Sequence, residues 1–113
     1  MRELLLTLSF ILGFTTAAQA VFVQNRDSWS QITQFEKENY IIGVYDAALF
    51  PSNGDSGNER RWKQKIQNCM WEIKATSKTL ADMVDNYYLN VANWSHPPIQ
   101  ALYNSTTELC DNR

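Results

Sequence analysis

Residues 78–92, KTLADMVDNYYLNVA, carry the clearest amphipathic pattern in this sequence. Apolar residues recur there at spacings of three and four, which places them on one face of a helix: Leu80, Met83, Val84, Tyr87, Tyr88 and Val91. Thr76 and Ser77 directly precede the pattern and supply side-chain oxygens of the kind that cap a helix. The stretch therefore predicts a helix over residues 78–92 with one buried face.

The same period predicts helices on both sides of this stretch. Over residues 27–50, Ser28 is the expected N-cap and Gln31 completes a capping box. The apolar stripe of that helix is Ile32, Phe35, Ile42, Tyr45 and Leu49. Gly43 lies inside it at a cost of up to about 1 kcal/mol, so we expect a close approach of another backbone there.

Two more helices complete the expected fold. Residues 51–58, PSNGDSGN, form a loop, and residues 59–74 predict a helix with these residues on its buried face: Trp62, Ile66, Cys69, Met70 and Ile73. Ser95 is the expected cap of a last helix, whose first turn tolerates Pro97 and Pro98. Its inner stripe is Ile99, Leu102, Tyr103, Thr106, Leu109 and Cys110. The short link over residues 93–96 makes the last two helices antiparallel neighbours.

The absence of alternating strand patterns and of internal repeats makes the predicted fold class all-α, a small four-helix domain. With 113 residues the chain has room for one small domain. A formal charge of −2 does not provide the basic surface that a nucleic-acid-binding protein normally shows.

The first twenty residues have the features of a secretory signal peptide. Met1 and Arg2 precede an apolar run over residues 4–14, and Ala18-Gln19-Ala20 has the form of a cleavage site. The run is much shorter than the roughly 20 residues that span a bilayer. We therefore expect export to the periplasm with cleavage after Ala20, which leaves residues 21–113 as a single helical domain.

Export makes a disulfide available to the two cysteines, and Cys69–Cys110 is the one pairing they allow. It would join the second helix to the last, and closing a loop of about 42 residues stabilises by roughly 4 kcal/mol in the chain-entropy estimate. The alternative is a cysteine nucleophile activated by His96, the sole histidine. Compartment and even cysteine count favour the disulfide.

The sequence offers little for catalysis, and we expect no enzyme activity. It contains no GxSxG, HExxH, CxxC or phosphate-binding glycine loop. Asp82 with Asp85, and Glu36 with Glu38, could form carboxylate pairs, but charge on a solvated helix face is the simpler interpretation. A single histidine also gives no reason to expect a metal or another cofactor.

Two features suggest binding to a partner. Trp94 lies in a polar connection, where it either inserts into a partner's cleft or folds back over the helix ends; the sequence leaves both open. A cluster of cations begins the helix over residues 59–74: Arg60, Arg61, Lys63 and Lys65. An acidic partner is one interpretation of that cluster, and a solvated helix face is the favoured one.

The order of several short motifs resembles the type VI secretion amidase immunity (Tai) proteins. Residues 40–47, YIIGVYDA, are similar to a stretch of that family. The later half has the same layout, with a mid-chain cysteine at 69, VDNYYL over residues 84–89, His96-Pro97, Ala101-Leu102 and a terminal cysteine at 110. These motifs cover most of residues 21–113.

The resemblance implies a small periplasmic, all-helical protein, often a homodimer, that binds and blocks a cognate peptidoglycan amidase effector of the papain-like cysteine peptidase type. The connection would enter the effector's cleft with Asn93, Trp94, Ser95 and His96. The exposed face of the preceding helix would flank it with Lys78, Asp82, Asp85, Asn86 and Asn90. No cofactor, metal, nucleic acid or membrane is implied after signal cleavage.

An alternative resemblance is to the small periplasmic acid-stress chaperones, which are helical, exported and carry one disulfide. Such a protein would expose apolar surface and suppress the aggregation of unrelated clients at low pH. A structural or lipid-carrying helical protein is a third class, for which the sequence shows no cavity signal.

Overall fold

The computed structural model describes residues 22–112, and these form helices without any strand. The elements are α2 (Arg26–Ser30), α3 (Gln34–Leu49), α4 (Gly57–Glu72), α5 (Ser77–Tyr87), the 3-10 turn η1 (Val91–Asn93) and α6 (Pro98–Asp111). Four of them are long helices, so the prediction of an all-α, four-helix fold is confirmed. The expected signal peptide, residues 1–20, lies outside the described residues.

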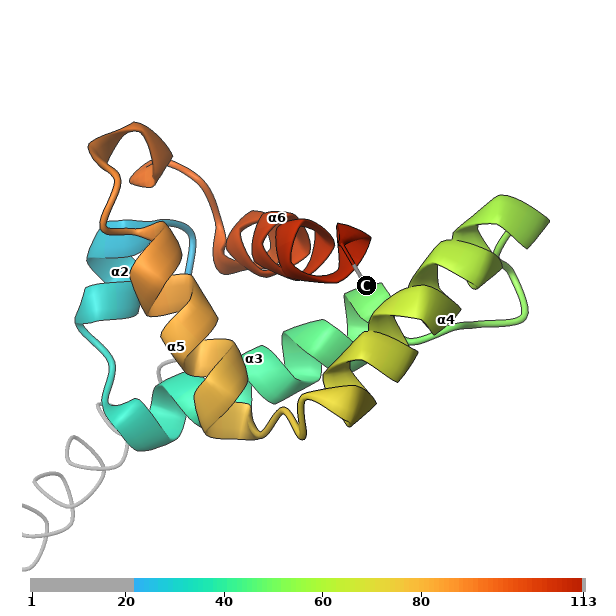
Figure 1. Ribbon diagram of the computed structural model, residues 1–113. Helices are drawn as coiled ribbons and strands as arrows, with labels where there is room; N and C mark the ends of the chain where they lie inside the picture. Colours follow the sequence, from blue (N-terminus) through green and yellow to red (C-terminus); the bar gives the residue numbers. More distant parts are fainter. Residues whose placement is uncertain (1–21, 113) are drawn as a thin grey trace, which may run out of the picture.

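The arrangement places α3 at the centre, with α5 and α6 packed against it (Figure 1). Helix α6 also contacts α4, which extends away from the other helices like an arm. Helices α5 and α6 pack together but cross one another (Figure 1), so the expected antiparallel pairing is wrong. The buried residues from these elements form one core: Trp29, Ile41, Leu49, Ile66, Leu80, Ala81, Val84, Tyr88, Ala101 and Leu102 among them.

The helix expected over residues 27–50 is two helices with a break after α2. Asn25 caps α2 and Ser28 is its third residue, while Thr33 and Glu36 form a capping box that starts α3. The expected capping box of Ser28 with Gln31 is therefore wrong, because two stronger caps compete for the same stretch. In α3, which begins anew at Gln34, Ile41 and Leu49 are buried. Phe35 and Ile42 of the predicted stripe are exposed, and so is Gly43.

No other backbone lies close to Gly43, so the expected close approach is wrong. A Cβ atom added at this position would meet nothing within 4 Å. The glycine therefore weakens α3 without a packing reason.

Helix α4 starts and ends with well-formed caps. Ser56 accepts a hydrogen bond from the Glu59 amide at its start. At its end Lys74 adopts a left-handed conformation with φ 56°, and Ala75 N donates to Met70 O at 3.0 Å. Together with the bond from Lys74 N to Trp71 O at 3.1 Å this is a Schellman motif, in which glycine is the usual residue.

The loop before α4 is tied to the helix by Asp55. Its carboxylate accepts from Ser52 N at 2.8 Å and from Lys63 Nζ at 2.9 Å. The Ser52 amide, and after it the Lys63 ammonium, hold the pKa of Asp55 below its ordinary value. The carboxylate thus stays ionised and holds the loop against the first two turns of α4, at the outer end of the arm (Figure 1).

The predicted disulfide is confirmed. Cys69 and Cys110 are both buried and bonded, with their Cα atoms 5.8 Å apart, and they join α4 to α6. Helix α6 begins after Pro97, so Ser95 is not its cap. The buried residues of α6 are Pro98, Ala101, Leu102, Thr106 and Cys110. Ile99, Tyr103 and Leu109 of the predicted inner stripe are exposed, because α6 is covered from one side only.

Candidate protein-binding site at the connection between α5 and α6

Helix α5 ends at Tyr87, five residues before the predicted end. The carbonyl groups at the end of a helix lack helical partners. Here, side chains of the residues that follow α5 donate hydrogen bonds to them. Asn93 Nδ2 donates to Tyr87 O at 3.0 Å, and the Trp94 indole Nε1 donates to Tyr88 O at 2.8 Å. These bonds fold the connection, residues 88–97, back onto the end of α5.

Trp94 therefore folds back over the helix ends, which is one of the two interpretations left open by the sequence. The Arg26 guanidinium lies over its ring, 4.5 Å from the centroid, and Arg26 N donates to Trp94 O at 3.0 Å. About two-fifths of the residue, 41 %, stays exposed. Trp94 thus joins the connection to α2 and forms part of its surface.

His96 is anchored by the two tyrosines at the end of α5. Its Nδ1 lies 2.6 Å from Tyr87 Oη, which accepts a bond from Asn104 Nδ2 at 3.0 Å. The Tyr87 hydroxyl thus links the His96 ring to Asn104 of α6. Tyr88 Oη donates to His96 O at 2.6 Å, and burial raises the pKa of Tyr88 to about 12. This hydroxyl remains a donor through the physiological pH range.

The tip of the connection carries two exposed apolar side chains, and neither was among the predicted binding residues. Leu89 is 80 % exposed and Val91 is 65 % exposed. The helical period over residues 78–92 predicted Val91 on the buried face, and the early end of α5 turns it outward. Figure 1 shows the connection projecting beyond the ends of α2 and α5. The result is a fixed apolar protrusion.

A groove of about 650 Å³ lies beside this protrusion, between α5 and α6. Three of the predicted binding residues, Asn86, Asn90 and Asn93, line it from α5 and the connection, and α6 contributes Ser105, Glu108 and Asn112. Carboxamide groups donate and accept hydrogen bonds, as a peptide backbone does. The groove is therefore chemically suited to an extended segment of another protein.

The other predicted residues lie apart from this groove. Lys78 and Asp82 form an exposed ion pair at 2.7 Å on the first turns of α5, and Ser95 is exposed on the connection. Asp85 accepts hydrogen bonds from Trp29 Nε1 at 2.7 Å and Lys37 Nζ at 3.1 Å. Asp82 and Asp85 therefore serve different partners and form no carboxylate pair.

The second expected carboxylate pair is also divided between two roles. Glu36 accepts from the Thr33 amide in the cap of α3, and Glu38 accepts from Ser77 Oγ at 3.1 Å.

Among residues 22–112, no three or more His, Cys, Asp or Glu side chains are grouped in a way that would hold a metal ion. No helix in the same part of the chain combines the length and apolar character needed to cross a membrane.

Comparison of the chain with known protein families, curated protein sequences and solved structures returned no match.

Proposed function

We propose that this protein is a periplasmic immunity protein that binds and sterically blocks a cognate peptidoglycan amidase delivered by type VI secretion, and so protects the producing cell. The observation that carries the proposal is the apolar tip of Leu89 and Val91 on a connection fixed by hydrogen bonds. A protrusion that is already ordered loses little conformational entropy on binding. It is thus suited to filling an enzyme's cleft.

The mechanism is occlusion of that cleft. Leu89 and Val91 enter first, with the exposed part of Trp94 beside them. The amides of Asn86, Asn90 and Asn93 bind the rim through hydrogen bonds. Trp94 and His96 hold the protrusion in shape through their hydrogen bonds to Tyr88 and Tyr87. The similarity of residues 40–47 and of the later half to the Tai family supports an amidase of the papain type as the partner, and the Cys69–Cys110 disulfide is compatible with an oxidising compartment.

The test uses the product of the reading frame that neighbours the gene for this chain. We expect it to be a small cysteine-peptidase-like amidase that digests peptidoglycan and is inhibited by this protein. Replacing both tip residues, Leu89→Asp with Val91→Asp, should weaken binding by at least about 2 kcal/mol, close to 30-fold, as for central interface residues. Calorimetric titration and a peptidoglycan digestion assay measure the two effects.

Phe35→Asp is the matched control, because Phe35 is an equally exposed apolar residue on α3. It should leave binding and inhibition unchanged. Equal binding by the tip variant would show that the connection is not the interface. A protein that leaves the amidase active, yet suppresses aggregation of unrelated denatured clients at acid pH, would instead be a chaperone.

A further inference from the structure

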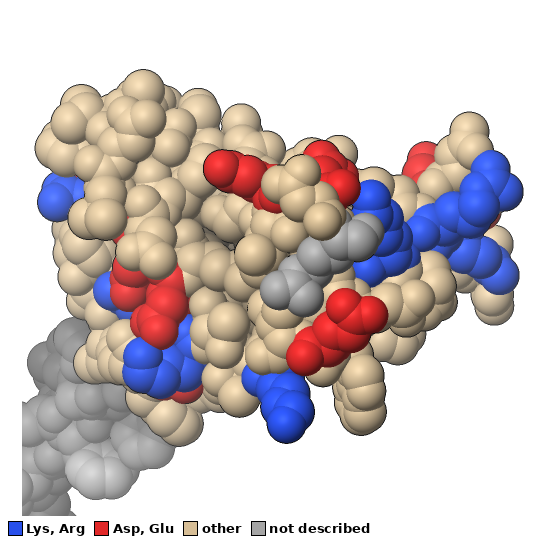
Figure 2. Space-filling model, viewed as in Figure 1, with Lys and Arg blue, Asp and Glu red and all other residues tan. Residues whose placement is uncertain are grey.

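The cations of this protein are concentrated on the arm. Residues 60–65 contain Arg60, Arg61, Lys63 and Lys65, although the whole chain carries a formal charge of −2. Figure 2 shows these positive side chains gathered at the α4 end of the molecule. The first turn of a helix is unfavourable for positive charge because of the helix dipole. Arg60, which ends the first turn of α4, therefore lies at an electrostatically unfavourable position.

Half of these cations are paired within the molecule. Lys65 lies 3.9 Å from Asp111 at the end of α6. Lys63 is paired with Asp55 at 2.9 Å, in a setting where both side chains are largely buried. Arg60 and Arg61 are exposed and donate to neutral oxygens, the Ser52 carbonyl and the Asn58 side chain. These two guanidinium groups remain available to carboxylates of another molecule.

One stripe of α4 leads from Arg60 to an exposed tryptophan, and Arg61 lies beside the start of that stripe. Arg60, Gln64, Gln67 and Trp71 are spaced at four, three and four residues, so they lie along one stripe of the helix. Trp71 is 86 % exposed at the end of this stripe. Eleven residues of helix separate Arg60 from Trp71 by about 16 Å.

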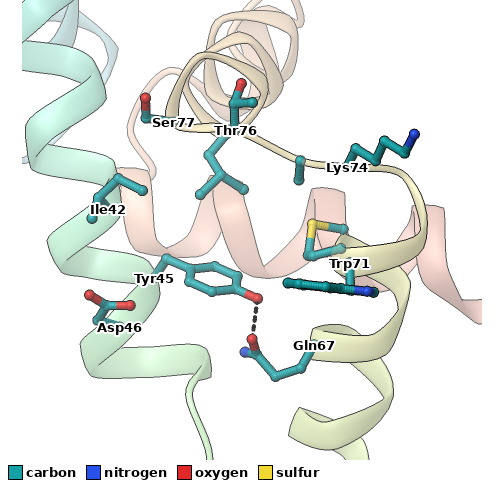
Figure 3. Close-up of a pocket in the computed structure, with 11 residues that line it drawn as sticks. Ile42, Tyr45, Asp46, Gln67, Trp71, Lys74, Thr76 and Ser77 are labelled. Carbon is teal, nitrogen blue, oxygen red and sulfur yellow. Dashed lines mark hydrogen bonds between the residues drawn. The ribbon is translucent and has the colours of Figure 1, made fainter.

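Trp71 forms one wall of a groove between α3, α4 and the turn into α5. The groove has a volume of about 550 Å³, and its lining includes the apolar side chains of Ile42, Met70 and Leu80, with Asp46 and Lys74 among its polar residues. Figure 3 shows the Trp71 indole beside Tyr45 and Gln67, whose side chains are joined by a hydrogen bond of 2.7 Å. Gln67 Nε2 also donates to Leu49 O at 3.0 Å, which holds this wall in place.

We propose that the outer stripe of α4 and the Trp71 groove together bind an acidic segment of a partner protein. An apolar side chain of that segment fills the groove against Trp71, and its carboxylates pair with Arg60 and Arg61. The distance of about 16 Å corresponds to five residues of extended chain. This surface is separate from the connection and does not depend on the function proposed for it.

The shape and charge of the surface favour a protein over other ligands. A groove admits a side chain, whereas a helix that lies on a bilayer presents a broad apolar face, and the outer stripe of α4 carries a single large apolar residue, Trp71. Nucleic acid would meet the overall negative charge of the molecule beyond the arm. An acidic peptide with one apolar anchor satisfies both parts of the surface.

The probe is a labelled synthetic peptide with a Leu-Trp anchor, a five-residue Gly-Ser spacer and four consecutive glutamates, titrated against the full chain by fluorescence anisotropy. We expect saturable binding that weakens as salt rises. Trp71→Ala should weaken it at least tenfold. Arg60→Ala combined with Arg61→Ala should weaken it about fivefold and remove most of the salt dependence. All three residues are exposed, so the variants should keep the fold.

Lys78→Ala is the matched control, since Lys78 is an exposed cation on α5, and it should bind the peptide like the original chain. The same peptide with lysines in place of the glutamates should not bind. Failure of the acidic peptide to bind, or equal binding by Trp71→Ala, would overturn the proposal. Binding to phosphatidylglycerol vesicles in place of the peptide, or self-association that Trp71→Ala abolishes, would assign the surface to a membrane or to a second copy of the chain.

Discussion

At the scale of single residues, Asp85 has the largest structural role that the sequence did not reveal. It accepts hydrogen bonds from the buried indole of Trp29 and from Lys37, and the Lys37 ammonium lies 5.4 Å from the centre of the Trp29 ring. These contacts join α2, α3 and α5. The partners are 56 and 48 residues away in sequence, so no local pattern could identify them.

Asp85→Ala should therefore lower the free energy of unfolding by about 2 to 4 kcal/mol, because it leaves a buried indole N–H and a largely buried ammonium without their acceptor. Urea denaturation followed by tryptophan fluorescence measures the change. Asp85→Asn keeps an acceptor for Trp29 and should lose about half as much. Asp82→Ala removes an exposed pair three residues away and should change stability by less than about 0.5 kcal/mol. Equal effects at the two aspartates would contradict the assigned role.

At the scale of elements, periodicity predicted the long helices better than it predicted their ends. Helices α4, α5 and α6 lie where their apolar spacing indicated, since that spacing is local. The end of α5 is determined by Asn93 and Trp94 of the connection, whose side chains donate hydrogen bonds to the carbonyl groups of Tyr87 and Tyr88. Because the helix ends there, Leu89 and Val91 are exposed. The sequence thus indicated the connection between α5 and α6, whereas it did not indicate that Leu89 and Val91 would be its most exposed apolar residues.

Two residues are poorly suited to the backbone conformation they adopt. Gly43 lies inside a helix, where alanine is more favourable, and Lys74 has the left-handed conformation that favours glycine. Gly43→Ala fills open space in an exposed helix and should raise the free energy of unfolding by roughly 1 kcal/mol. Lys74→Gly relieves a left-handed conformation that costs 1 to 2 kcal/mol, and the added freedom of the unfolded chain returns part of it, so we expect a net gain of about 0.5 kcal/mol to 1 kcal/mol.

Ala47→Gly, on the exposed side of the same helix α3, is the control with the opposite expected sign. Lys74→Ala keeps the left-handed strain and should leave stability nearly unchanged. Thermal unfolding of the four variants at one pH compares them directly. A loss of stability in Gly43→Ala would mean that the open space beside the glycine is needed.

At the scale of the whole molecule, the helices form a core of α3, α5 and α6 with α4 attached to one side. Helix α4 packs mainly on α6 and has fewer contacts with α3. It carries the cations and Trp71, whereas the connection with Leu89 and Val91 lies at the other end of the fold (Figures 1 and 2). The two proposed surfaces can thus be occupied together, provided that α4 stays attached.

The Cys69–Cys110 disulfide holds α4 in that place, which leads to a prediction with two readouts. Cys69→Ala combined with Cys110→Ala opens a loop of 41 residues in sequence separation and should lower the free energy of unfolding by about 4 kcal/mol, with alanine filling the buried sites without a polar group. Hydrogen exchange should accelerate more in α4 than in α5, because α5 belongs to the core that the disulfide does not span. Reduction of the original chain with dithiothreitol should reproduce both changes. Uniform acceleration across all helices would show that the arm and the core unfold as one cooperative unit.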